Sequence, residues 1–191
     1  MMKFYYSTAT CSTACHIAIE ELGLDYTPIE VSWKREINVA ELNKLNPLGS
    51  VPVLVSEQGK TLTQNTAILE YLADQKPSAH LLGEQGACQR NDTMRWVAFL
   101  VYKKKKSFSP FFHAKHITTS EANQKEMIDY YTKKLQNLLT YIEEKLTGKD
   151  YIMGKQFTIA DAYLFTILGW TKWVNISTKE HKNITSYMKR V

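Results

Sequence analysis

The stretch at residues 46–55 constrains the fold of this chain more than any other part of the sequence. Pro47 and Gly49 mark a turn, and Pro52 then begins a short β-branched run that predicts a strand. Proline has no N–H and tolerates a cis bond, so the Val51-Pro52 step can bend the chain and leave the Val51 backbone groups free. Free backbone groups at the start of a strand can bind an extended peptide as an added strand would.

Gln64 and Asn65 follow at the point where the sequence pattern predicts the start of the next helix. A helix start presents amide donors and the positive end of the helix dipole to a carboxylate. Together with the Val51-Pro52 step, this arrangement predicts a site for a small acidic peptide.

The first 76 residues alternate between strand and helix patterns, and the predicted order is β-α-β-α-β-β-α. That order is typical of a thioredoxin-like α/β domain whose last two strands form an antiparallel hairpin. The predicted strands are residues 3–6, 26–31, 53–55 and a short segment around 61–62; the predicted helices are residues 12–22, 37–45 and 65–74.

Residues 77–86 interrupt the pattern and predict a linker, and residues 87–191 predict an all-α helical bundle, because no segment there has a strand pattern. We expect a helix from 88 to about 112 that is kinked or ends near Pro110. An amphipathic helix is predicted at 121–146 and an almost wholly apolar, buried one at 160–170. Thr158 and Asp161 have the spacing of a capping box, so a structural role is expected for Asp161.

The composition, with 44% hydrophobic and 23% charged residues, is that of a globular protein, and no run is long enough to span a membrane. Three cysteines without framework spacing favour a reducing compartment, so we expect a cytoplasmic protein. Cys11 and Cys15 form neither a redox pair nor a zinc knuckle, and no metal is expected. Cys15 lies one helical turn beyond Cys11 and is expected in the core.

Charge is divided unevenly along the chain. Residues 1–80 hold 6 Lys or Arg against 9 Asp or Glu, whereas residues 81–191 hold 18 against 10. The basic residues are mostly scattered along helical patterns, so a nucleic-acid partner is not expected. The exception is the four-lysine run at 103–106, which is either a solvated helix face or a site for an anionic ligand.

Four segments in this order resemble the cytosolic glutathione transferases, most closely the bacterial beta class. They are residues 3–12, 46–54, 62–72 and 157–165. The resemblance covers residues 2–190 and implies an N-terminal thioredoxin-like domain that binds reduced glutathione, an all-helical C-terminal domain, and a homodimer.

The resemblance also implies roles for individual residues in binding glutathione. The Val51 backbone would pair with the cysteinyl part of glutathione, with Pro52 in cis, and Gln64 and Asn65 would hold the γ-glutamyl end. The family commonly has serine or another small residue at the position of Asn65, so this chain departs from the pattern. The side chain of Lys34 or Arg35 would bind the glycyl carboxylate.

Cys11 matches the cysteine that the beta class has beside the glutathione sulfur. A thiol just before a helix gains from the dipole and the free amides, which favours its thiolate. Cys11 could stabilise the bound thiolate or form a mixed disulfide, or it could be a half-buried apolar residue. Tyr6 and Ser12 are donors of the kind that other classes use. Where the beta class commonly has a His near the sulfur, this chain has Lys105. A lysine can stabilise a thiolate as a point charge, but it does not shuttle protons near pH 7 unless it is desolvated.

A second-substrate pocket is expected in the helical domain, where each aromatic candidate has core packing as its alternative role. The candidates are Tyr102, Lys106, Phe108, Phe111, Phe112 and Trp170. The family usually continues into a final helical segment beyond the position of Val191, so we expect this pocket to lack part of that cover.

Three functions are compatible with the sequence. The first is a transferase that conjugates the glutathione thiolate to small apolar electrophiles. The second is glutathione-dependent thiol–disulfide exchange or peroxide reduction through Cys11, which predicts that Cys11→Ala abolishes activity. The third is a non-catalytic binding module with the same fold.

Overall fold

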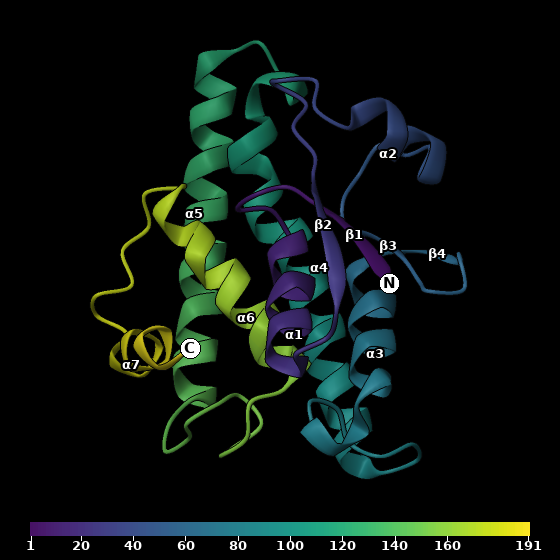
Figure 1. Cartoon of the computed structure of the whole chain (residues 1–191). Coiled ribbons are helices and arrows are strands. Elements are labelled where there is room, and N and C mark those ends of the chain that lie inside the picture. The colour runs from purple at the N-terminus through teal and green to yellow at the C-terminus, as the bar shows by residue number, and fades with distance from the viewer.

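A computed structural model describes residues 1–103 and 106–191 of the chain. The N-terminal domain is built on a four-stranded sheet in the order β2-β1-β3-β4 (Figure 1). Strand β1 pairs in parallel with β2 and antiparallel with β3, and β3 pairs antiparallel with β4. The elements are β1 Met2–Tyr6, α1 Ser12–Leu22, β2 Tyr26–Glu30, α2 Val39–Leu45, β3 Val53–Val55, β4 Thr61–Thr63 and α3 Asn65–Gln75. The predicted element order is confirmed.

Both faces of the sheet are covered, because side chains alternate along a strand. Phe4 packs with residues of α1 and α3 in the main core, whereas its neighbour Tyr5 packs with Leu42 of α2 in a second, smaller core. The Tyr5 hydroxyl donates to Glu41 of α2. Burial and this contact raise the pKa of Tyr5 to about 12.

The second half of the described chain is helical, as predicted. It contains a 3₁₀ turn η1 Pro77–Ala79 in the predicted linker, then α4 Cys88–Ile117, α5 Glu121–Lys145, α6 Ile159–Gly169, η2 Trp170–Lys172 and α7 Lys182–Arg190. The prediction that the long helix ends near residue 112 is wrong, since α4 runs through Pro110 to Ile117. A proline removes a single backbone hydrogen bond, and Pro110 is buried, so packing offsets the loss.

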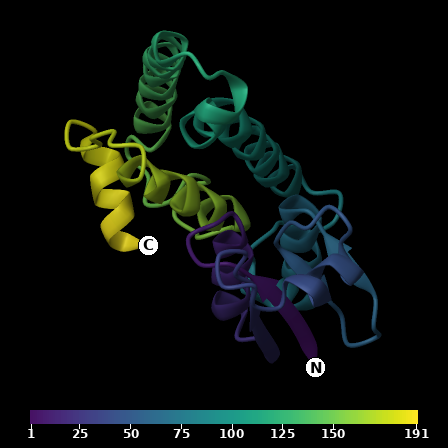
Figure 2. The ribbon, with the colours of Figure 1, turned by 90° about the horizontal axis from the view of Figure 1, so that it is seen from above.

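Helix α6 of the helical domain lies at the domain boundary, where it contacts α1 of the N-terminal domain and α4 of its own domain (Figure 2). Its apolar residues are buried on nearly all sides, as the sequence predicts. The capping box at its start is confirmed: Asp161, which has no exposed surface, accepts from the Thr158 N–H at 3.0 Å and from the Ile152 N–H at 2.8 Å. Burial raises the pKa of Asp161.

An ion-pair cluster also links the domains. Arg90 of α4 donates to Glu70 and Asp74 of α3 at 2.8 Å each. The Arg90 side chain is only 12% exposed, and its guanidinium lowers the pKa of the Asp74 carboxyl through a direct hydrogen bond. These contacts hold α3, which ends the sheet domain, against the first turns of α4.

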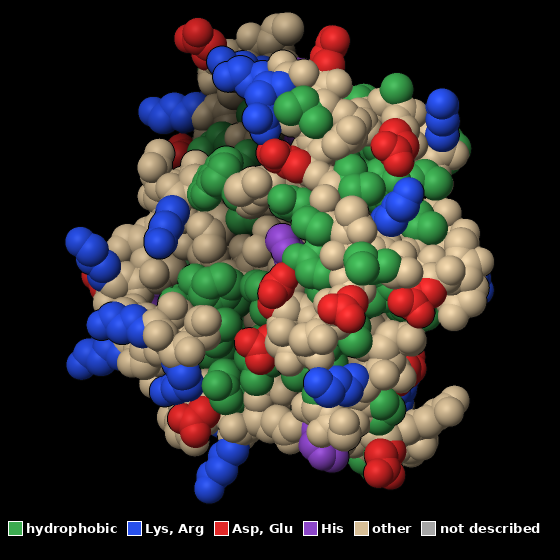
Figure 3. All heavy atoms as spheres, in the orientation of Figure 1, with side chains coloured by type: hydrophobic (Ala, Val, Ile, Leu, Met, Phe, Trp, Pro, Cys, Tyr) green, Lys and Arg blue, Asp and Glu red, His purple; other side chains and the backbone are tan. Residues whose placement is uncertain are grey.

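The surface reflects the division of charge along the chain. On the face seen in Figure 3, lysine and arginine side chains gather on the side of the helical domain, and several acidic ones lie over the N-terminal domain. Within the described ranges, every helix is too short or too polar to cross a bilayer.

Candidate functional site

A cavity of about 750 Å³ opens between the two domains. Its wall on the N-terminal side is formed by the β1–α1 loop, the segment at Val51-Pro52 and the first turn of α3. Its opposite wall is formed by α4, α6 and η2. The cavity brings together eight of the residues predicted from the sequence: Cys11, Val51, Pro52, Gln64, Asn65, Phe108, Phe112 and Trp170.

The β1–α1 loop is fixed by hydrogen bonds within itself. The Ser12 hydroxyl accepts from the Ser7 N–H at 3.1 Å and donates to the Ser7 carbonyl at 3.0 Å. Ala9 has a φ of 60°, which is costly for a residue with a Cβ. The Trp170 indole N–H donates to the Ala9 carbonyl at 3.0 Å, so the helical domain holds this loop in its strained form.

Cys11 immediately precedes α1, and its half-buried side chain lines the cavity. Its thiol donates to the Val51 carbonyl at 3.5 Å, which joins the two N-terminal segments of the cavity wall. Among the described residues, no hydrogen-bond partner is found for the Val51 N–H. This amide is therefore the free donor that the sequence predicts, while the carbonyl is shared with Cys11.

The Val51-Pro52 peptide bond is cis. The turn before it is held by Asn46, whose side-chain amide donates to the Ser50 carbonyl at 2.8 Å. Gly49 in this turn has a φ of 59°, a conformation that glycine adopts without strain. The Asn46 side chain and the Gly49 conformation thus set the backbone that leads into the Val51-Pro52 step.

Gln64 and Asn65 form the start of α3 beside the cavity, as predicted. Gln64 is exposed and has a φ of 72°, another strained position at the cavity wall. Asn65 is 9% exposed, and its side-chain oxygen accepts from the buried thiol of Cys15 at 3.3 Å. The predicted core location of Cys15 is confirmed.

The opposite wall is aromatic. The ring of Trp170 stands edge-on to Phe108 and Phe112, with ring centroids 5.8 and 6.2 Å apart. Phe108 is 2% exposed and Phe112 is 45% exposed, so Phe112 offers more surface to a ligand. Tyr163 of α6 also lines the cavity, and burial raises the pKa of its hydroxyl.

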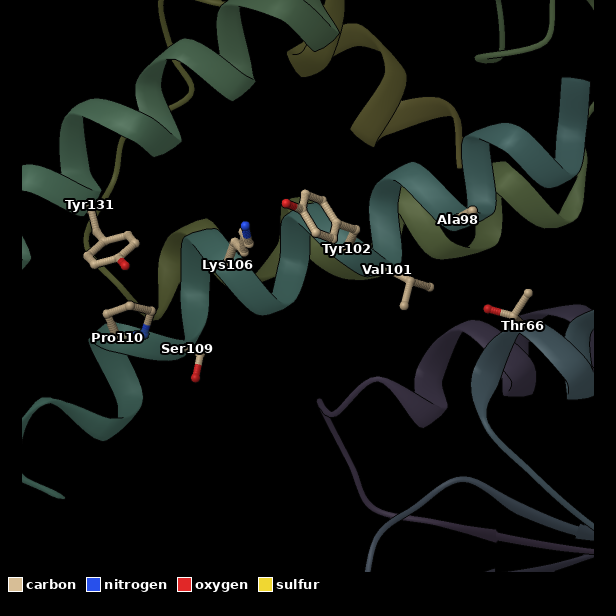
Figure 4. A pocket seen from close by; sticks show the side chains of 8 residues that line it. All are labelled: Thr66, Ala98, Val101, Tyr102, Lys106, Ser109, Pro110 and Tyr131. Atoms are coloured by element: carbon tan, nitrogen blue, oxygen red, sulfur yellow. The ribbon is translucent and has the colours of Figure 1, made fainter. Parts of the chain in front are cut away.

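Three of the predicted second-substrate residues lie outside this cavity. Tyr102 and Lys106 line a neighbouring pocket along α4, which shares Thr66, Val101 and Ser109 with the cavity. Thr66 of α3 and Tyr131 of α5 lie at its two ends (Figure 4). The Lys106 ammonium lies 4.6 Å from the centroid of the Tyr102 ring. Phe111 lines a third hollow, between α4 and α5. Helical spacing alone does not say which side of α4 faces α6, so it does not separate these three residues from those of the cavity wall.

The other predicted donors are also absent from the cavity wall. Tyr6 packs into an aromatic cluster with Phe4 and His16, and Ser12 is fully buried in its loop. A donor role for either is not supported by this geometry. Position in the family motif does not show that Tyr6 packs against His16 of α1 or that the Ser12 hydroxyl bonds to Ser7 within the loop.

Lys34 and Arg35 lie in the exposed segment between β2 and α2, and neither lines the cavity. Arg35 donates to Glu30 at 2.6 Å instead. Lys105 lies outside the described residues, so the predicted role of its ammonium is not tested here. Over the rest of the chain, no group of three or more metal-ligating side chains comes together.

Sequence reasoning missed several residues of the cavity wall. They are Ala9, Thr10, Ser50, Thr66, Val101, Ser109, His113, Tyr163 and Trp173. A signal existed for those on α4, since residues 101, 108, 109, 112 and 113 recur on one side of a helix. Trp173 follows Trp170 by one turn, whereas the loop residues carry no comparable pattern.

Comparison with known proteins gives the same assignment along the whole chain. The family model for the glutathione S-transferase N-terminal domain matches residues 2–74, and the model for the C-terminal domain matches residues 92–191. Glutathione S-transferase GstA of Escherichia coli O157:H7 is 35% identical over 192 residues, which cover 100% of this chain and 92% of the relative.

Solved structures agree with these matches. The beta-class glutathione S-transferase of Sphingomonas chungbukensis is 33% identical, with a TM-score of 0.87 over 98% of this chain and 91% of that one. A sphingomonad glutathione S-transferase, solved in complex with glutathione, is 31% identical with a TM-score of 0.85 over the same shares of the two chains. The domain matches and the relatives above 30% identity show that this chain belongs to the glutathione S-transferase family.

Proposed function

We propose that this enzyme binds reduced glutathione in the cavity between its domains and conjugates the glutathione sulfur to small apolar electrophiles. The cysteinyl backbone of the peptide would pair with Val51 beside Pro52, and the γ-glutamyl end would lie at Gln64 and Asn65. The observation that carries the proposal is that one 750 Å³ cavity joins these peptide-binding segments to Cys11 and to an aromatic wall.

The chemistry requires the thiolate of glutathione. A thiol has a pKa of about 8.5, so lowering it toward neutrality raises the thiolate fraction at pH 7 from a few per cent to about half. The thiol proton leaves to solvent, the sulfur attacks the electrophilic carbon, and a C–S bond forms as the leaving group departs with its electron pair. Cys11 would turn its thiol proton from the Val51 carbonyl to the thiolate, and the first turn of α1 would add its dipole.

The aromatic wall supports an apolar second substrate. Phe108, Phe112 and Trp170 present ring surface opposite the peptide-binding segments, within the same cavity. Burial of apolar surface there would position the electrophile beside the sulfur without requiring a specific hydrogen bond. We also propose a homodimeric, cytoplasmic protein, on the basis of the family.

Calorimetric titration with reduced glutathione near pH 7 tests the site. We expect saturable one-to-one binding at up to millimolar affinity, and weaker binding by Gln64→Ala. Gln58→Ala is the matched control, because Gln58 lies exposed in the β3–β4 turn, away from the cavity. Absence of binding by the wild-type protein, or equal weakening by the two variants, would overturn the proposed site.

A second candidate reaction is favoured by the location of Cys11 in the cavity wall. In this reaction the Cys11 thiolate attacks the disulfide of a glutathione mixed disulfide, R–S–S–G, and releases R–SH. A second glutathione thiolate then attacks the Cys11–glutathione disulfide, which releases oxidised glutathione and restores Cys11. This reaction requires Cys11, so Cys11→Ser should abolish it, whereas conjugation would survive at a reduced rate.

A further inference from the structure

Cys15 is a buried nucleophilic group that the proposed mechanism does not use. It lies on α1, one turn beyond Cys11, and has no exposed surface. Its thiol lies 3.3 Å from the side-chain oxygen of Asn65 and 3.9 Å from the Asn65 carbonyl oxygen. Because burial raises the pKa of Cys15, the sulfur keeps its proton at neutral pH and is a donor.

This contact decides which way the Asn65 side chain faces. A carboxamide has an oxygen that only accepts and an NH₂ group that only donates, and the two can exchange places by rotation. A neutral thiol donor fixes the oxygen on the side of α1. The NH₂ group is then directed away from Cys15, and Asn65 lines the cavity at the first turn of α3.

The orientation of the Asn65 carboxamide decides whether it presents a donor or an acceptor to the cavity. We propose that Cys15 is a positioning residue, which holds the Asn65 amide so that its NH₂ group donates to the α-carboxylate of the γ-glutamyl end of glutathione. The proposal rests on the proposed function, since it requires glutathione in this cavity. In this role Cys15 does not itself contact glutathione.

A double-mutant cycle tests the proposal, with the dissociation constant of reduced glutathione measured by calorimetry. Loss of one hydrogen bond corresponds to about a fivefold weaker affinity, so we expect that change in Cys15→Ala. Cys15→Ser keeps a donor and should bind within about twofold of the wild type. In an Asn65→Ala background, Cys15→Ala should have no further effect, because the group that it positions is gone.

A steady-state measurement separates positioning from general damage. The KM for glutathione should rise in Cys15→Ala while kcat at saturating glutathione is retained, because the sulfur and the electrophile are held by other residues. Cys88→Ala is the control for loss of a thiol, since Cys88 is exposed at the start of α4. Thermal unfolding of each variant identifies any affinity change that merely follows loss of folded protein.

The outcomes distinguish this proposal from the proposed function. If the wild-type protein does not bind glutathione, the proposed function fails and this inference fails with it. If Asn65→Ala weakens binding but Cys15→Ala does not, the positioning role alone is overturned. Equal effects of Cys15→Ala in the two backgrounds would also overturn it, because the thiol would then act independently of Asn65.

Discussion

The buried carboxylate of Asp161 is expected to contribute several kcal/mol to stability. It accepts from the backbone N–H groups of Ile152 and Thr158 at 2.8 and 3.0 Å, and from the Thr158 hydroxyl at 2.9 Å. Replacement by alanine leaves the two backbone donors buried without an acceptor, at about 1.5 kcal/mol each. Two further effects oppose each other: removal of a buried charge stabilises the variant, whereas loss of the helix cap destabilises it. The expected loss of stability for Asp161→Ala therefore stays at about 3 kcal/mol.

Urea denaturation followed by circular dichroism measures this loss. A decrease of about 3 kcal/mol corresponds to a drop in Tm of about 6–12 °C for a chain of this length. Asp150→Ala is the control, because the Asp150 side chain is 54% exposed and lies 3.6 Å from Arg190. That variant should lose about 0.5 kcal/mol or less. A loss below about 1 kcal/mol for Asp161→Ala would refute the reasoning, because two buried N–H groups would then be unpaired at almost no cost.

Three further predictions follow from the site and from the domain contacts. Cys11→Ala should lower kcat/KM for conjugation by about 10-fold if the thiol donates one hydrogen bond to a thiolate, and complete loss in steady-state assays would favour the disulfide reaction instead. Trp170→Phe removes the hydrogen bond to the Ala9 carbonyl, so the free energy of unfolding in urea should fall by about 1 kcal/mol and the KM for glutathione should rise. An unchanged KM would mean that the β1–α1 loop keeps its shape without this bond. Arg90→Met should lower the free energy of unfolding at pH 6. Because Arg90 lowers the pKa of Asp74, its stabilising effect is lost when that carboxyl is protonated, so the difference in unfolding free energy between variant and wild type should shrink as the pH falls below the ordinary Asp value of 3.8. A difference that stays constant from pH 6 to pH 3 would contradict this.

The fold could be predicted from the sequence because its signals are local. The strand at residues 53–55, the helix that begins at Ser12 and the capping box at Thr158 each depend on residues within a few positions of one another. The error at Pro110 has a tertiary cause. A proline usually ends a helix, and only burial against the rest of the domain shows why α4 continues beyond it.

The site was predictable only in part. On the N-terminal side of the cavity, turn and helix-start patterns predict Val51, Pro52, Gln64 and Asn65, and the family resemblance implies Cys11. The other lining residues on this side, Ala9, Thr10, Ser50 and Thr66, have no pattern that marks them. The second wall depends on how α4 rotates against α6, which the spacing of Tyr102 and Phe108 does not specify. The pairing of Cys15 with Asn65 joins residues 50 positions apart, and no pattern within either segment indicates it.

The hydrogen bond between Trp170 and Ala9 has a consequence for how this enzyme could diversify. It spans 161 positions in the sequence and ties the helical domain to the loop at Ala9, the residue with a positive φ. Phe112 and Trp173 line the same cavity and are both exposed. New electrophiles could therefore be accommodated by exchanging those outer aromatic residues, while the indole that secures the peptide half of the cavity is left in place.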